Sequence, residues 1–159
     1  MQRLVLVWWL LSMGLARAGQ ETGQPEPPLQ GRLWLNAGFY SAHFDTGKGL
    51  RNANPGLGAQ YTLDNNWSLT AGRFLNSDNA HSHYLGVYWQ PWTFAGARWG
   101  AVAGAFNGYP KAFHGGWFPA LLPVASWEGE RLGLNVTLVP TLQDRLYGAM
   151  SFQLKYRLP

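Results

Sequence analysis

From residue 33 onward, apolar and polar residues alternate with a period of two, in short runs separated by turn-forming residues. Such alternation is typical of β-strands that have one buried face. In the first run, one face carries Leu33, Leu35, Ala37 and Phe39, and the other carries Trp34, Asn36, Gly38 and Tyr40. The pattern predicts eight strands, over residues 33–40, 56–63, 67–75, 83–92, 97–107, 119–127, 131–139 and 145–158.

The connections between these strands alternate in length. Those at 64–66, 93–96 and 128–131 are tight, those at 44–54, 76–82 and 108–118 are long and polar, and the one at 140–144 is shorter. Eight antiparallel strands with short turns at one end and longer loops at the other are typical of small outer-membrane barrels. Aromatic residues near the strand ends fit the interfacial girdles of such barrels; they are Trp34, Trp67, Trp89, Trp92, Trp99, Trp117 and Trp127. We therefore predict an all-β fold, an eight-stranded antiparallel transmembrane β-barrel.

A soluble lipocalin-like barrel is the competing fold. It would need charged residues on its outward face, whereas here Lys, Arg, Asp and Glu gather at turns and strand ends. The run 97–107, for example, contains only Arg98 as a charged residue. The outward face therefore suits lipid better than water.

The first 18 residues have the pattern of a secretory signal peptide, an apolar run from Leu4 to Leu15 followed by the small-x-small site Ala16-Arg17-Ala18. Residues 19–30, rich in Gln, Glu and Pro, are expected to form a flexible lead-in, and residues 31–159 to form the barrel. The last strand resembles the C-terminal signal that outer-membrane proteins present to the barrel-assembly machinery. We expect a monomer in the outer membrane of a Gram-negative bacterium.

The charge of the segment after the signal peptide gives no indication of a nucleic-acid partner. Without Arg3 and Arg17, 10 of the 12 basic residues remain against 8 acidic residues, a net charge of +2. The sequence contains no cysteine, which excludes a disulfide scaffold.

Three prolines lie in the hairpin predicted between residues 119 and 140, at Pro119, Pro123 and Pro140. A proline lacks a backbone N–H and removes a ladder hydrogen bond, a loss that lipid cannot replace. Folding the hairpin about its turn places Pro119 roughly opposite Pro140, with Pro123 below. All three would weaken one seam near the long loops, and such a seam could open laterally to admit a lipid chain.

At these residues the sequence resembles the lipid A palmitoyltransferase (PagP) family. The matching elements are Pro119-Ala-Leu-Leu-Pro-Val-Ala-Ser126 and Thr137-Leu-Val-Pro140, with weaker similarity over about 55–92. The resemblance implies an outer-membrane acyltransferase that moves an acyl chain from a phospholipid donor to lipid A, within a lumen that holds the chain. The family's second proline pair is matched only at Pro55, because the partner position falls near Gly38.

Acyl transfer to a hydroxyl requires a base and a group that stabilises the oxyanion. The family uses a histidine at the end of the first strand and an Asp-Ser pair in the second long loop, which correspond to His43, Asn76 and Ser77 here. An asparagine thus replaces the aspartate; it cannot take a proton, although its amide could donate to an oxyanion. Asp45 or Asp78 could substitute for the carboxylate.

Two further predictions concern substrate binding. The family position that sets the floor of the acyl pocket corresponds to Tyr88, whose ring would leave room only for a shorter chain. Cations in or near the long loops could meet lipid A phosphates; they are Lys48, Arg51, Arg73 and Lys111. His81, His83 and His114 lack an acidic or cysteine partner at diagnostic spacing, so we predict no metal site and no cofactor.

Two other functions remain open. In the first, water replaces the acceptor hydroxyl, giving a lipid A deacylase or phospholipid esterase; His43-Phe-Asp-Thr-Gly and Asn54-Pro-Gly bear a faint resemblance to elements of the 3-O-deacylase family. In the second, the protein is a non-catalytic small outer-membrane barrel. The replaced aspartate favours this second reading, whereas the proline-rich seam disfavours it.

Overall fold

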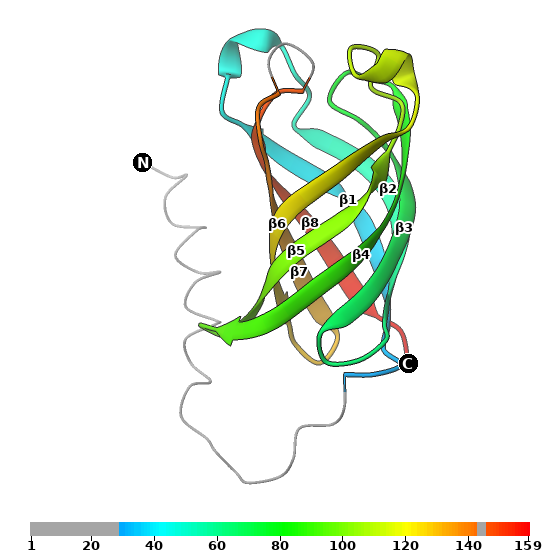
Figure 1. The fold of residues 1–159 in the computed structure, drawn as a ribbon, viewed down its shortest axis with the longest axis vertical. Helices are drawn as coiled ribbons and strands as arrows, with labels where there is room; N and C mark the ends of the chain where they lie inside the picture. Colours follow the sequence, from blue (N-terminus) through cyan, green and yellow to red (C-terminus); the bar gives the residue numbers. More distant parts are fainter. Residues whose placement is uncertain (1–28, 143–145) are drawn as a thin grey trace, which may run out of the picture.

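The computed structural model describes residues 29–142 and 146–159. The predicted signal peptide, most of the lead-in and Arg145 lie outside these residues. The described strands are Leu33–His43 (β1), Ala53–Thr62 (β2), Trp67–Leu75 (β3), His81–Phe94 (β4), Ala97–Phe106 (β5), Phe118–Glu128 (β6), Leu132–Val139 (β7) and Ala149–Arg157 (β8). Each strand pairs antiparallel with its neighbours and β1 pairs with β8, so the predicted closed eight-stranded barrel is confirmed (Figure 1).

Tight turns join the strands at the lower end of the barrel in Figure 1, and longer loops join them at the upper end. Asp64 holds the β2–β3 turn, because its Oδ1 accepts hydrogen bonds from the backbone N–H groups of Asn66 (2.7 Å) and Trp67 (2.8 Å). The β4–β5 turn is formed by Ala95 and Gly96, whose φ angles of 51° and 70° are those of a type I′ hairpin turn. The backbone twist of this turn matches the twist of the two strands. Two short 3-10 helices, Thr46–Lys48 (η1) and Phe113–Gly115 (η2), lie in the upper loops.

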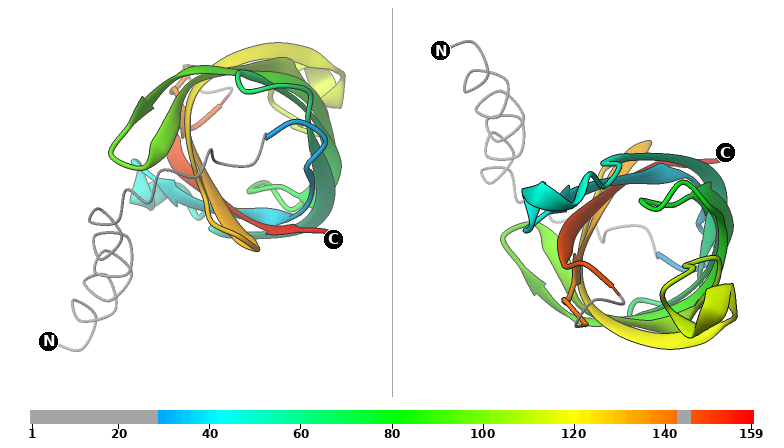
Figure 2. Two further views of the ribbon diagram at one scale, coloured as in Figure 1. Left: turned by 90° about the horizontal axis from the view of Figure 1, so that it is seen from below. Right: turned by 90° about the horizontal axis from the view of Figure 1, so that it is seen from above.

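The β4–β5 hairpin extends beyond the barrel wall at the lower end, as the two end-on views of Figure 2 show. This hairpin is longer than predicted, since β4 begins at His81 and continues to Phe94. Its outer surface carries exposed aromatic rings, and Trp89 and Trp92 pack edge to face with centroids 5.3 Å apart. The indole of Trp99 donates to the Phe94 carbonyl (2.9 Å), which ties the two strands together near the turn.

The outward face is largely apolar and the inward face is largely polar in its lower half. Leu57, Leu69, Leu85, Leu121 and Leu154 are all more than 40% exposed, whereas the buried set contains many amides and hydroxyls. This arrangement is the reverse of a soluble domain and matches a barrel whose strands alternate apolar-out and polar-in. No helix among the described residues is long and apolar enough to cross a membrane.

A bulge in β1 changes the predicted facing of its upper half. Toward β8, Ala37 and Gly38 together face Leu154, so β1 contains one extra residue. The β1–β2 register also shifts there, because Pro55 and Gly56 of β2 together face Gly38. A side chain at position 38 would overlap the backbone of Asn54, so only glycine fits there. As a result Phe39 turns inward against Phe74, and Tyr40 is 53% exposed; the sequence-based assignment of these two residues to the opposite faces was wrong.

Candidate functional site

The lower half of the barrel interior is filled by a hydrogen-bonded polar network, which we call the polar floor. Its charged members are Glu128, Arg98 and Lys155; Oε1 of Glu128 accepts from Arg98 Nη2 (2.8 Å) and Lys155 Nζ (2.6 Å). Amide side chains continue the network across the interior; they are Gln60, Gln90, Asn135 and Gln153. These side chains fill the space between opposite strands, so the lower lumen is closed by a polar layer.

Above the polar floor lies a small apolar cavity. Its volume is about 80 Å³, and the residues that shape it include Phe39, Phe74, Tyr84, Tyr88, Val102 and Leu122. Pockets for drug-sized ligands usually measure about 300–1,000 Å³. The cavity therefore has room for a short stretch of hydrocarbon rather than for a whole long acyl chain.

Tyr84 and Tyr88 form the boundary between the cavity and the polar floor. The hydroxyl of Tyr88 accepts a hydrogen bond from Asn135 Nδ2 (3.4 Å), and that of Tyr84 accepts one from Gln153 Nε2 (3.2 Å). The Tyr88 ring is only 5% exposed and faces the interior, where a bulky ring at this position was expected to shorten the space for a chain. Gly58 and Gly72 are opposite each other and make room for Tyr84, since a Cβ on either would overlap its hydroxyl.

The seam between β6 and β7 is paired only in its lower half. The β6–β7 ladder runs from Glu128↔Gly133 to Val124↔Thr137 and stops there, although β6 continues to Phe118. On its other side β6 stays paired with β5 as far as Phe106↔Phe118. The upper part of β6, residues 118–123, therefore has no ladder partner toward β7.

The prolines explain why the ladder ends at this point. Pro119 and Pro123 remain in the unbroken ladder with β5, which a proline permits only when its nitrogen points away from that neighbour. Both nitrogens therefore face β7 and offer it no donor. The β6–β7 register, extended upward, places Pro140 opposite Leu121, so the expectation that Pro119 lies roughly opposite Pro140 is corrected by two residues.

The unpaired part of the seam lies beside the apolar cavity. Leu122 on β6 and both Thr137 and Val139 on β7 line that cavity. The two strands thus border the cavity at the place where they lack hydrogen bonds to each other. In contrast, β1–β2 pairing resumes above the Pro55 bulge at Phe39↔Asn54, so the first hairpin has no comparable gap.

His43 is the last residue of β1 and lies at the upper rim of the barrel. Its Nδ1 lies 3.0 Å from Oδ1 of Asn52. An amide oxygen only accepts hydrogen bonds, so Nδ1 carries the hydrogen and Nε2 keeps its lone pair. The residue that orients this imidazole is therefore an asparagine from the first long loop, and neither Asp45 nor Asp78 forms a hydrogen bond or ion pair with His43.

Ser77 lies in the second long loop and is connected to the strands through Asn54. Asn54 is buried, and its Nδ2 donates to Ser41 Oγ (3.0 Å) and to Ser77 Oγ (3.3 Å). Ser77 Oγ accepts this bond, which leaves its own O–H free to donate to another group. Oδ1 of Asn54 is buried and has no hydrogen-bond partner among the described residues.

Asn76 anchors the loop and has no donor left for an oxyanion. Its Nδ2 donates to Ser82 Oγ (2.9 Å) and the Gly108 carbonyl (2.8 Å), while its Oδ1 accepts from the backbone N–H groups of Asp78 (2.9 Å) and Ala80 (3.0 Å). The side chain is completely buried. All four of its hydrogen-bonding positions are occupied, so the expectation that its amide could stabilise an oxyanion is replaced by a structural role.

We expect that replacing Asn76 with aspartate, the residue of the resembled family, will loosen these loops without increasing any acyl transfer. A carboxylate cannot donate to Ser82 or Gly108 and would place an oxygen against the Gly108 carbonyl. The expected loss of stability is about 1–3 kcal/mol, measured by urea unfolding, with faster protease cleavage in the loop at 107–117. Asn79→Asp is the matched control, because the Asn79 side chain only accepts a bond, from Arg51, and an aspartate can do the same. Wild-type stability of Asn76→Asp would contradict this assignment.

The remaining candidate residues lie outside the cavity. Arg73 is exposed on the outward face of β3, and His81 and His83 are exposed on the outward face of β4. Lys48 and Lys111 both lie over the ring of Tyr147, with Nζ 5.6 Å and 5.3 Å from its centroid. Within the described parts of the chain, no group of three His, Asp, Glu or Cys side chains is placed to bind a metal ion.

Comparison with known proteins supports the fold and gives no family. The barrel is similar to the solution NMR structure of the de novo designed protein TMB2.3, with 18% sequence identity and a TM-score of 0.58. The similarity covers 86% of this chain and 99% of that chain. No protein-family model matches the sequence, and the search of curated proteins also found no match. The resemblance to lipid A palmitoyltransferases therefore remains a prediction.

Proposed function

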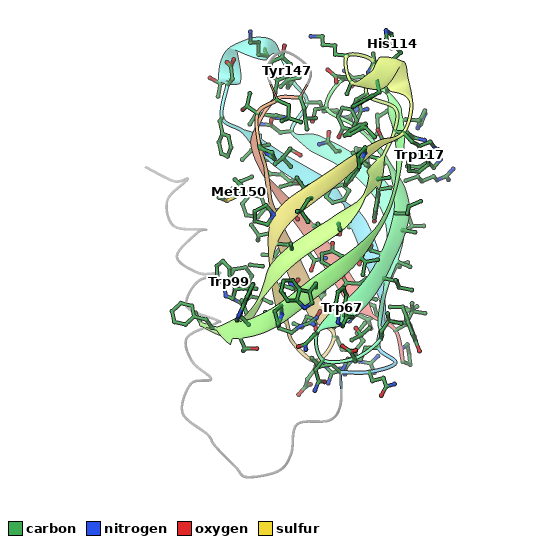
Figure 3. All side chains as sticks on the ribbon, in the orientation of Figure 1. Trp67, Trp99, His114, Trp117, Tyr147 and Met150 are labelled. Carbon is green, nitrogen blue, oxygen red and sulfur yellow. The ribbon has the colours of Figure 1, made fainter. Side chains whose placement is uncertain are left out.

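We propose that the protein is a small outer-membrane barrel. The support is the arrangement of its side chains, with leucines on the outer wall and buried charges inside. Trp67 and Trp99 lie near the end with the tight turns, Met150 lies at mid-height, and Trp117 lies near the loop end (Figure 3). Tryptophans at both borders of an apolar outer surface are typical of barrels that span a membrane.

We further propose that the barrel transfers an acyl chain from a phospholipid to lipid A. The observation that carries this proposal is the unpaired upper half of the β6–β7 seam beside the apolar cavity. A barrel with only a structural role gains nothing from missing hydrogen bonds in lipid, which cost several kcal/mol for each unsatisfied group. A lateral opening gives a hydrocarbon chain a route from the bilayer into the interior.

In this proposal His43 is the base. Its Nε2 takes the proton of a lipid A hydroxyl, whose oxygen attacks the ester carbonyl of the phospholipid. The Ser77 hydroxyl donates to the oxygen that becomes negative, and collapse of the intermediate releases a lysophospholipid, which takes the proton back from His43. The small cavity above Tyr88 supports transfer of a chain shorter than palmitate.

A reversible cross-link over the open part of the seam tests this function. Pro123→Cys and Leu138→Cys introduce the only two cysteines of the chain at positions that the extended register places opposite each other. We expect the oxidised protein to add acyl groups to lipid A at least about tenfold more slowly than the reduced protein, because entry is a gated step. Lipid A mass spectrometry on purified protein in vesicles measures the product.

The matched control is a cross-link in the paired part of the same seam, with Ala125→Cys and Val136→Cys. Its oxidation is expected to leave the rate unchanged. Equal rates of acyl transfer by the oxidised and reduced forms of the Pro123→Cys and Leu138→Cys double variant would exclude the lateral route. A loss of acyl mass from lipid A would instead favour the deacylase, and an unchanged spectrum from a folded wild-type barrel would favour the non-catalytic barrel.

A further inference from the structure

A basic patch lies on the outer wall of the barrel, on adjacent strands near the loop end. Arg73 on β3 is directly opposite His83 on β4, and His81 lies two residues further up β4. All three side chains are exposed on the outward face, because they alternate with the buried Phe74 and Ser82. Directly opposite residues of paired strands have Cβ atoms about 5 Å apart, so Arg73 and His83 can contact one group together.

The patch lies at the upper border of the apolar wall. Trp89 marks the lower border on β4, and the eight residues from Trp89 to His81 span roughly 27 Å along the strand at about 3.4 Å per residue. At a strand tilt of about 40°, this length corresponds to a rise of roughly 21 Å along the barrel axis. The apolar band of such barrels is about 25 Å tall. His81 therefore lies near the upper border of the band. His83 and Arg73 lie two residues lower, and the long side chain of Arg73 extends upward toward the headgroups of the outer leaflet.

The patch differs from the rest of the wall at this height. The outward residues in the upper parts of the other described strands are uncharged, among them Tyr40, Leu57, Leu121 and Leu138. Arg73 has no hydrogen bond or ion pair with any described residue. An unpaired guanidinium facing lipid is stabilised when an anion at the membrane surface neutralises it.

We infer that Arg73, His83 and His81 form a binding site for the phosphate group of an outer-leaflet lipid. The guanidinium supplies paired N–H donors, and the imidazoles add donors from the neighbouring strand. Leu57 is directly opposite Arg73 on β2, and Leu85 lies two residues below His83 on β4; both are exposed and would contact the acyl chains of the same lipid. This position selects a phosphate carried by a membrane lipid, because the patch faces the bilayer and not the water above the loops.

The inference rests on the proposed membrane location and does not depend on acyl transfer. The site would hold a phosphorylated lipid against the outer wall, apart from the cavity and the β6–β7 seam. It would thereby keep a headgroup next to the upper rim, where His43 lies. Binding can therefore be measured on purified protein without any acyl donor.

The test is lipid binding by the full barrel in phosphatidylcholine nanodiscs, with native mass spectrometry to count bound lipid A molecules. We expect Arg73→Gln to weaken binding of phosphorylated lipid A about fivefold, the effect of one basic residue at a membrane surface. The triple variant with Arg73→Gln, His81→Gln and His83→Gln should bind phosphorylated lipid A more weakly than Arg73→Gln alone. Lipid A without phosphates should bind wild type and Arg73→Gln equally, and inorganic phosphate should not compete.

Arg131→Gln is the matched control, since it removes the same charge from the turn at the opposite end of the barrel. It should bind phosphorylated lipid A as the wild type does. Heat-modified gel migration reports that each variant is a folded barrel. Equal weakening by Arg73→Gln and Arg131→Gln, or no weakening by Arg73→Gln, would overturn the site. Competition by inorganic phosphate would show that the site takes the free anion and would overturn the lipid assignment.

Discussion

Replacing Glu128 with glutamine is expected to destabilise the barrel by about 3–5 kcal/mol, the usual cost of leaving buried charge without its partner. Among the residues that the structure describes, Glu128 is the one carboxylate that contacts both Arg98 and Lys155. Lys155 is 2% exposed, and its Nζ lies 4.9 Å from the centre of the Trp34 ring, which cannot replace a carboxylate. The variant would leave two cations in the interior next to each other.

The matched comparison is Lys155→Met, which keeps a one-to-one pair of Arg98 and Glu128. It removes the bonds from Lys155 to Glu128 Oε1 (2.6 Å) and to Gln60 Oε1 (3.2 Å) but leaves no buried charge without a partner, so we expect a smaller loss of about 1–2 kcal/mol. Urea unfolding of the refolded barrel in phospholipid vesicles measures both free energies. A cost for Lys155→Met equal to or above that for Glu128→Gln would show that the two cations do not depend on this carboxylate.

Most of the architecture could be predicted from the sequence, because the strands of a closed barrel alternate between inward-facing and outward-facing residues, which gives a period of two. The tight turns at 64–66, 93–96 and 128–131 were informative for the same reason, since their residues favour hairpins. The prediction failed at Phe39 and Tyr40. A bulge adds one residue to a strand and inverts the facing of those that follow, and the sequence around Gly38 shows only a glycine.

The polar floor could not be predicted from local patterns. Glu128 and Arg98 were grouped with charges at turns and strand ends, yet they are buried and paired inside the barrel. Lys155 and Gln60 are 95 residues apart in the sequence and meet only after the barrel closes. Their pairing depends on the stagger of the strands around the whole barrel, which no short segment specifies.

The sequence could predict where the candidate residues lie in the fold, but not which side chains they contact. The family resemblance placed His43 at the end of the first strand and Ser77 in the second long loop, and the structure has both residues there. Asn-Ser-Asp-Asn does not reveal which amide anchors the turn. Asn52 and Asn54 were missed as contacts of the site, because a loop asparagine has no distinctive sequence pattern. In the structure, His43 is thus oriented by Asn52 and not by a carboxylate.

His43→Asn is expected to reduce acyl transfer to lipid A about 100-fold or more, the usual contribution of a general base. Asparagine is polar and similar in size but cannot accept the proton from the attacking hydroxyl. His114→Asn is the matched control: it removes a loop histidine at the same end of the barrel, and asparagine tolerates the left-handed backbone there (φ 54°). Mass spectrometry of lipid A incubated with each purified variant and a phospholipid donor gives the initial rates.

The variant Asn52→Ala tests whether His43 acts as a base or has only a structural role. Without the side-chain carbonyl of Asn52, the tautomer of His43 with its hydrogen on Nδ1 is no longer favoured. A smaller fraction of His43 then presents a basic Nε2 toward the rim. We expect an intermediate rate, about tenfold below wild type, with unchanged stability. The double variant His43→Asn with Asn52→Ala should be no slower than His43→Asn, because the two residues act through the same nitrogen. Independent, multiplying losses would contradict the assignment of Asn52 as the residue that orients the base.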